Sequence, residues 1–123
     1  GLTELGILSA SDQPIHEADA YKKYYMHRTS HWLGMDVHDV GAYYLDGKPR
    51  PLLAGMVLTV EPGLYFPPDD SLVPEALRNV GIRIEDDILV TPTGSLNLSA
   101  SIVKTVDEIE RLMARSSGFE RRL

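Results

Sequence analysis

The stretch MVLTVEPGLY, residues 56–65, decides how the second half of this chain folds. Its apolar, β-branched run predicts a strand over Met56–Glu61. Pro62-Gly63 stops that strand, and residues 64–66 resume it. Glu61 therefore lies at a strand end, where a carboxylate is costly to bury unless it is paired or binds a cation. The alternative interpretation is a strand-end glutamate exposed to water.

A second β region is predicted over residues 80–90, VGIRIEDDILV. Its isoleucines alternate with charged residues, so Arg83 and Glu85 lie together on one face of the strand. One interpretation is that Arg83 and Glu85 form a salt bridge on a solvent-exposed face of the sheet. In the functional interpretation, Glu85 is a carboxylate ligand and Arg83 orients a second acidic group.

The segments around these strands predict short elements. Residues 21–41 show no dominant period and hold three of the four histidines, which indicates a structured loop with short extended pieces. Asp46-Gly47-Lys48-Pro49 has turn chemistry, and residues 96–102 are predicted as a return strand. Thr105–Glu108 matches a capping box. It starts a closing helix whose apolar stripe is Val106, Ile109, Leu112 and Met113.

The N-terminal segment has the character of a helix interior. Residues 1–8 carry apolar residues at helical spacing without an initiator Met, which suggests a fragment or a processed product. Ser11–Pro14 predicts the start of a second, short helix that runs through about Ala20. We expect residues 1–115 to form one domain and residues 116–123 to be a flexible tail.

Composition narrows the classes of protein. The 123 residues fit a single domain, and 43% hydrophobic and 24% charged residues are ordinary for a globular protein. A net charge of −6 without a Lys/Arg stripe argues against nucleic acid as a partner. There are no cysteines, and no apolar run approaches the length of a membrane span. We therefore expect a soluble cytoplasmic domain with no membrane partner.

The histidines point to a metal site. His27, His31 and His38 fall within twelve residues, interleaved with apolar side chains. A lone histidine in such a segment is more often structural, but three together are less ordinary. With the strand carboxylates Glu61 and Glu85 they suit Mn²⁺, Co²⁺ or Zn²⁺ in a hydrolytic site. Because the separations are long and unspecific, the residues alone indicate only a metal hydrolase.

Three motifs make the assignment sharper, because together they resemble the Xaa-Pro aminopeptidase (aminopeptidase P) family. Residues 27–41, HRTSHWLGMDVHDVG, resemble its histidine loop. Residues 57–65 resemble its glutamate strand, although Ala54 replaces the usual proline before Gly55. Residues 81–87, GIRIEDD, resemble its last ligand motif. The motifs occur in the family's order.

The resemblance implies an α+β fold, namely the C-terminal half of a pita-bread fold over residues 1–115. Such a half is a curved, mostly antiparallel sheet with flanking helices. The resemblance further implies that His31 and Glu61 bind one ion of a dinuclear centre and that Glu85 bridges both ions. Mn²⁺ is the implied metal, with Co²⁺ and Zn²⁺ as alternatives.

The implied reaction is removal of the N-terminal residue that precedes proline in a peptide. His27 and His38 resemble the family's histidines that contact substrate and stabilise the transition state, and Arg83 resembles the residue that pairs with an aspartate ligand. The two cations would activate water for attack on the carbonyl and stabilise the developing negative charge.

One departure from the family is serious, since its two aspartate ligands lie upstream of the region that this chain resembles. The aspartates in the first half of the chain have the wrong context to replace them: Asp12, Asp19, Asp36, Asp39 and Asp46. We therefore expect an incomplete metal centre and an inactive or impaired isolated chain. It would associate with itself or with a missing N-terminal half.

Three alternatives remain. Prolidase, an Xaa-Pro dipeptidase, shares the fold and ligands, but Ser30–Gly34 and Pro74–Arg78 resemble the aminopeptidase more. A pita-bread interaction module without catalysis is a second alternative, which the retained candidate ligands disfavour. A half-size protein that forms a symmetric dimer is the third.

Overall fold

The computed structural model describes residues 1–8 and 20–115. These residues form short strands, two 3-10 helices and one α-helix. In chain order the elements are η2 (Ala20–Lys23), β1 (Leu33–Gly34), β2 (Val37–His38), β3 (Tyr44–Leu45), β4 (Lys48–Pro49), β5 (Val57–Val60), β6 (Gly63–Tyr65), η3 (Glu75–Leu77), β7 (Gly81–Arg83), β8 (Asp86–Thr91), β9 (Gly94–Asn97) and α2 (Val106–Met113).

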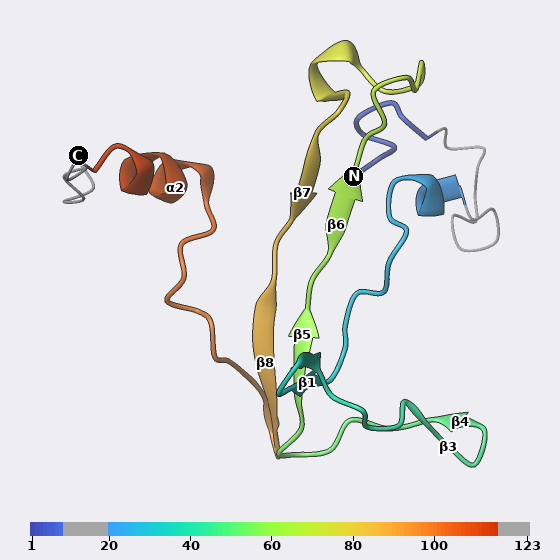
Figure 1. Ribbon diagram of the computed structural model, residues 1–123, viewed down its shortest axis with the longest axis vertical. Helices are drawn as coiled ribbons and strands as arrows, with labels where there is room; N and C mark the ends of the chain where they lie inside the picture. Colours follow the sequence, from blue (N-terminus) through green and yellow to red (C-terminus); the bar gives the residue numbers. More distant parts are fainter. Residues whose placement is uncertain (9–19, 116–123) are drawn as a thin grey trace, which may run out of the picture.

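A long antiparallel ribbon forms the axis of the molecule (Figure 1). Along one side of it β5 is followed by β6, and along the other β7 is followed by β8. β9 adds a third strand beside β8, in the order β5-β8-β9. All strand pairs among the described residues are antiparallel, in agreement with the mostly antiparallel sheet that the resemblance implies.

The ribbon is interrupted at one place without losing its register. Val60 pairs with Asp86 before the break, and Gly63 pairs with Arg83 after it. Two residues lie between the paired positions on each strand, so Glu61 comes opposite Glu85. The ladder stops here because Pro62 has no N–H to donate, although its carbonyl still accepts from the Ile84 N–H at 3.1 Å.

The two predicted β regions are therefore each divided into two strands. The return strand is also shorter than predicted, because β9 ends at Asn97 and the chain then turns. The turn is held by Ser99, whose hydroxyl donates to Asp86 at 2.7 Å, and by Lys104, 2.9 Å from the same carboxylate oxygen. These partners, Ser99 first, lower the pKa of Asp86 to about 2.

The predicted turn at Asp46-Gly47 is confirmed. It joins β3 to β4, and both residues have positive φ, 51° and 73°, as a tight two-residue hairpin turn requires. The predicted N-terminal helix is wrong for residues 1–8, which form turns. A single bond from the Leu5 N–H to the Gly1 carbonyl is helical, and Gly6 leaves the helical region at φ +70°.

The second predicted helix lies outside the described residues except for Ala20, which begins η2. The tail, residues 116–123, lies outside them too.

Helix α2 begins as predicted. The Thr105 side chain accepts from the Glu108 N–H, and the Glu108 side chain accepts from the Thr105 N–H, which completes the capping box. The apolar stripe of α2 is nevertheless exposed, with 69% of Val106 and 49% of Leu112 accessible. α2 lies to one side of the ribbon in Figure 1, and none of its residues is buried.

A small core lies beside β6. Its buried side chains are Ile7, Leu8, Tyr24, Phe66 and Val73. The Tyr24 hydroxyl donates to the buried Asp70 carboxylate at 2.7 Å, and the Lys23 ammonium lies 2.7 Å from the same oxygen. Hydrogen bonds from these two groups, Lys23 first, lower the pKa of Asp70 to about 2.

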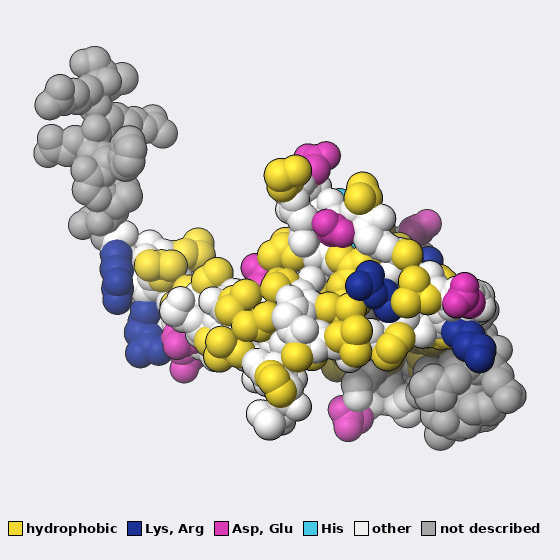
Figure 2. Space-filling model, turned by 90° about the horizontal axis from the view of Figure 1, so that it is seen from below, with side chains coloured by type: hydrophobic (Ala, Val, Ile, Leu, Met, Phe, Trp, Pro, Cys, Tyr) yellow, Lys and Arg dark blue, Asp and Glu magenta, His cyan; other side chains and the backbone are white. Residues whose placement is uncertain are grey.

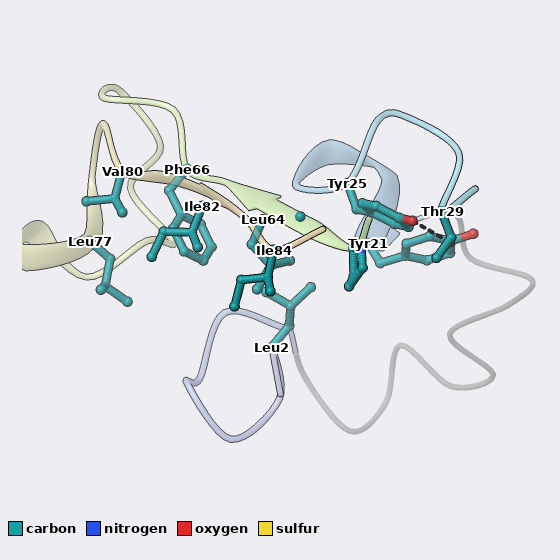
Figure 3. A pocket seen from close by; sticks show the side chains of 12 residues that line it. Leu2, Tyr21, Tyr25, Thr29, Leu64, Phe66, Leu77, Val80, Ile82 and Ile84 are labelled. Atoms are coloured by element: carbon teal, nitrogen blue, oxygen red, sulfur yellow. Dashed lines mark hydrogen bonds between the residues drawn. The ribbon is translucent and has the colours of Figure 1, made fainter. Parts of the chain in front are cut away.

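The two faces of the β6–β7 ribbon differ in chemistry. Leu64, Ile82 and Ile84 point into an open apolar pocket on one face (Figure 3), whereas Arg83 lies on the other. Hydrophobic side chains also cover much of the surface seen in Figure 2. The core is therefore small compared with the apolar surface that this part of the chain leaves exposed.

Candidate metal centre

The interruption of the ribbon brings two carboxylates together. Glu61 and Glu85 are cross-strand neighbours, and like charges in such positions repel each other. Glu61 is also buried, with only 7% of its surface accessible, so its interpretation as a water-exposed residue is wrong. Two facing carboxylates, one of them buried, form an arrangement that a bound cation would stabilise.

His31 completes the group. Its backbone N–H donates to the Thr59 hydroxyl at 3.1 Å, and its carbonyl accepts from the Thr59 N–H at 2.9 Å, so β5 holds the histidine loop in place. Ring atom Nδ1 lies 3.0 Å from the Trp32 carbonyl, which can only accept, so Nδ1 carries the proton. Nε2 is then free to bind a metal, and it lies 3.1 Å from Glu61 Oε1.

The donor set fits a divalent cation. One ligand atom each from His31, Glu61 and Glu85 lies within 4.8 Å of the others, and no other such cluster occurs in residues 1–8 and 20–115. One imidazole and two carboxylates suit Mn²⁺, Co²⁺ or Zn²⁺. Three protein groups are too few for a closed dinuclear site, so further ligands would have to come from outside the described residues.

Arg83 pairs with Glu61 across the ribbon. Its Nη1 lies 3.3 Å from Glu61 Oε2, whereas the ion pairs of the described residues include none between Arg83 and Glu85. The interpretation of Arg83 and Glu85 as a salt-bridged surface pair is therefore wrong. The pKa of Arg83 is raised, first by its hydrogen bond to Tyr65 and also by the charges of Glu61 and Glu85.

The other two predicted site residues, His27 and His38, lie in a pocket that is also lined by His31 and Glu61. The ring of His38 stands 4.2 Å from that of His31, centroid to centroid. His27 Nδ1 lies 2.8 Å from the Arg28 carbonyl, so it carries the proton in the neutral ring. His27, His38 and Arg83 thus line one pocket with His31 and Glu61.

Tyr65 joins this site although the sequence analysis did not single it out. Arg83 Nε donates to its hydroxyl at 2.7 Å, and the hydroxyl lies 2.9 Å from His27 Nε2. Because Nε2 of the neutral ring can only accept, Tyr65 donates to it. Strand alternation could have found Tyr65, since it shares the face of its cross-strand diagonal neighbour Arg83.

Two glycines make room for the Tyr65 ring. A Cβ atom on Gly63 would lie 2.7 Å from the Tyr65 hydroxyl, and one on Gly81 would lie 3.0 Å from ring atom Cδ1. Gly81 is the direct cross-strand partner of Tyr65. The ring therefore lies close against the ribbon, and this holds its hydroxyl between His27 and Arg83.

The profile of metallopeptidase family M24 matches residues 6–92, more than half of the chain. This chain belongs to metallopeptidase family M24. The Xaa-Pro aminopeptidase of Escherichia coli (strain K12) is 56% identical to this chain over 113 residues. That match covers 92% of the chain and 25% of the relative. Xaa-Pro aminopeptidase 3 of Rattus norvegicus is 45% identical, over 94% of the chain and 22% of the relative.

Solved structures agree with the family. Aminopeptidase PepP of Pseudomonas aeruginosa superposes with a TM-score of 0.85 at 50% identity, over 92% of the M24 chain and 26% of that protein. Aminopeptidase P of E. coli, solved with the inhibitor Pro-Leu, gives 0.80 at 55% identity, over 91% and 25%. The expected α+β, pita-bread class is therefore confirmed. The M24 chain spans about a quarter of the length of these relatives.

In the enzyme that this chain would form with the N-terminal half carried by its relatives, we expect Tyr65→Phe to lower kcat by about 10- to 100-fold with little change in KM. The variant keeps the ring against the glycines but removes the hydroxyl that joins His27 to Arg83. Steady-state kinetics on an Xaa-Pro peptide measure both constants. Tyr44→Phe is the matched control, because Tyr44 is 59% exposed on the β3–β4 hairpin. Equal kinetics for the two variants would contradict a role for the Tyr65 hydroxyl.

Proposed function

We propose that this chain is the metal-binding C-terminal part of an Xaa-Pro aminopeptidase, which removes the residue that precedes proline at a peptide's N-terminus. The observation that carries the proposal is the placement of Glu61 opposite Glu85, with His31 beside them. The names of its similar proteins support the same activity.

In this proposal His31 and Glu61 would hold one divalent cation, and Glu85 would help to hold it and a second. Mn²⁺ is the proposed ion, and it would supply Lewis acidity and an activated water. Arg83 neutralises the charge on Glu61 Oε2 and keeps the carboxylate oriented. His27, fixed by Tyr65, is placed in the pocket to hold the scissile group, and His38, beside His31, is placed there to donate a hydrogen bond to the developing oxyanion.

The remaining ligands of the centre are proposed to come from a polypeptide segment outside this chain. In the family pattern these ligands are two aspartates from an N-terminal half. We call the chain joined to that segment the assembled enzyme. Association of two copies of the chain is the rival source of the missing ligands. The exposed stripe of α2 and the apolar face of β6–β7 support a large covering partner in either case.

A comparison of two substrates tests the activity. The assembled enzyme should cleave a tripeptide Xaa-Pro-Xaa much faster than the dipeptide Xaa-Pro, as amino-acid analysis of the products would show. Preference for the dipeptide would make the protein a prolidase instead. Cleavage of neither peptide by a metal-loaded protein would favour a non-catalytic interaction module.

The helices in residues 1–8 and 20–115 all lack the length and apolar character that a membrane crossing requires. A cytoplasmic location remains part of the proposal, and cell fractionation would test it.

A further inference from the structure

Arg28 is a cationic side chain in the pocket of the candidate metal centre that the proposed mechanism does not use. It lines this pocket together with His27, His31 and Glu61. Its side chain belongs to an exposed residue of the histidine loop, so it is accessible from solvent. An accessible guanidinium next to a reaction centre is placed to contact whatever occupies the pocket.

The two guanidinium groups of the pocket differ in their partners. Arg83 is paired with Glu61 at 3.3 Å. Arg28 takes part in none of the ion pairs found within the described part of the chain, and its guanidinium instead lies 5.5 Å from the centre of the Tyr43 ring. A guanidinium held over the face of an aromatic ring keeps N–H donors at its edge available for a planar anion.

The ring under Arg28 is itself held firmly. Tyr43 stacks on Trp32 with 5.7 Å between centroids and 17° between planes, and its hydroxyl accepts from the backbone N–H of Trp32 at 3.2 Å. Trp32 is buried, and Arg50 lies 5.7 Å from its ring. Arg28 therefore rests on a stack of aromatic rings that joins the β3–β4 hairpin to the histidine loop.

We propose that Arg28 binds the C-terminal carboxylate of a short peptide and makes the enzyme prefer such substrates. The proposal rests on the proposed function and deepens it. Cleavage of a short Xaa-Pro-Xaa peptide releases Pro-Xaa, whose C-terminal carboxylate is negatively charged. A carboxylate matches the two parallel donors of a guanidinium, whereas a C-terminal amide has no charge and offers one acceptor. Arg28 thereby also sets the direction in which the peptide lies.

Peptide acids and amides provide the test. With the metal-loaded assembled enzyme, kcat/KM is measured for Xaa-Pro-Leu and for the same peptide with a C-terminal amide. We expect the acid to be preferred by about tenfold, since a charged hydrogen bond at an exposed site is worth about one order of magnitude. Arg28→Gln should abolish this preference, and Arg28→Lys should keep part of it.

Lys48→Gln is the matched control, because it removes the same charge from β4, away from the pocket. It should leave the ratio of acid to amide unaltered. An equal rate for acid and amide in the unmodified protein, or the same ratio in Arg28→Gln, would overturn the proposal.

Binding without turnover separates this inference from the proposed function. If the protein cleaves neither peptide, the proposed function fails, and calorimetry with Pro-Leu and Pro-Leu amide still tests Arg28. About tenfold tighter binding of the acid that is lost in Arg28→Gln would support the carboxylate site. Equal affinities for acid and amide would overturn it.

Discussion

Glu61→Gln is expected to lower kcat/KM of the assembled enzyme by about a thousandfold and to remove most of its bound metal. The substitution keeps the size of the side chain but takes away an anionic ligand that is buried and lies 3.1 Å from His31 Nε2. It also leaves Arg83 without its carboxylate partner. Metal content per chain and steady-state hydrolysis of an Xaa-Pro tripeptide measure the two effects.

Glu110→Gln is the control for this substitution. Glu110 is exposed on α2, so the same chemical change should alter neither the metal content nor the activity. Thermal unfolding of both variants shows whether the fold is retained. Activity of Glu61→Gln within threefold of the unmodified enzyme would exclude Glu61 as a metal ligand.

The isolated chain is expected to bind less than one metal ion per chain and to have no measurable peptidase activity. Only His31, Glu61 and Glu85 form a ligand cluster in the described residues, and two of them are carboxylates that repel each other without a cation. Joining the chain to the upstream three quarters of the E. coli relative should restore two ions and at least about a thousandfold more activity.

Metal analysis after dialysis and peptide hydrolysis test this expectation, and light scattering adds the state of association. The chain leaves apolar side chains of β7 and α2 exposed, so we expect it to self-associate when alone. Two tightly held ions on a monomeric isolated chain would contradict the requirement for further ligands. Two ions on a dimer would favour the symmetric half-size protein.

Much of the local structure was predictable because it depends on neighbouring residues. The capping box at Thr105, the tight turn at Asp46-Gly47 and the shared face of Arg83 and Glu85 each follow from chemistry within a few positions. The prediction of an N-terminal helix was wrong because this segment's conformation depends on distant contacts. Apolar spacing over eight residues is too weak to outweigh the contacts that bury Ile7 and Leu8 in the core.

The candidate site divides in a similar way. Motif resemblance predicted His31, Glu61 and Glu85 as candidate ligands, and their chemistry indicated a divalent metal. Tyr65 was missed because its role depends on two partners, His27 and Arg83, that lie 38 and 18 residues away in the sequence. Its contact with glycines on both strands of the ribbon likewise depends on strand pairing.

By itself, the sequence determined the family, the two β regions, the helix start and the residue types of the candidate metal site. Only the tertiary structure decided that Glu61 faces Glu85, that Arg83 pairs with Glu61 and that Arg28 rests on Tyr43. The physical reason is register, because pairing of β5–β6 with β7–β8 continues across the break at Pro62. Hydrophobic pattern within a strand sets which face a side chain takes, but only pairing sets which residue it meets.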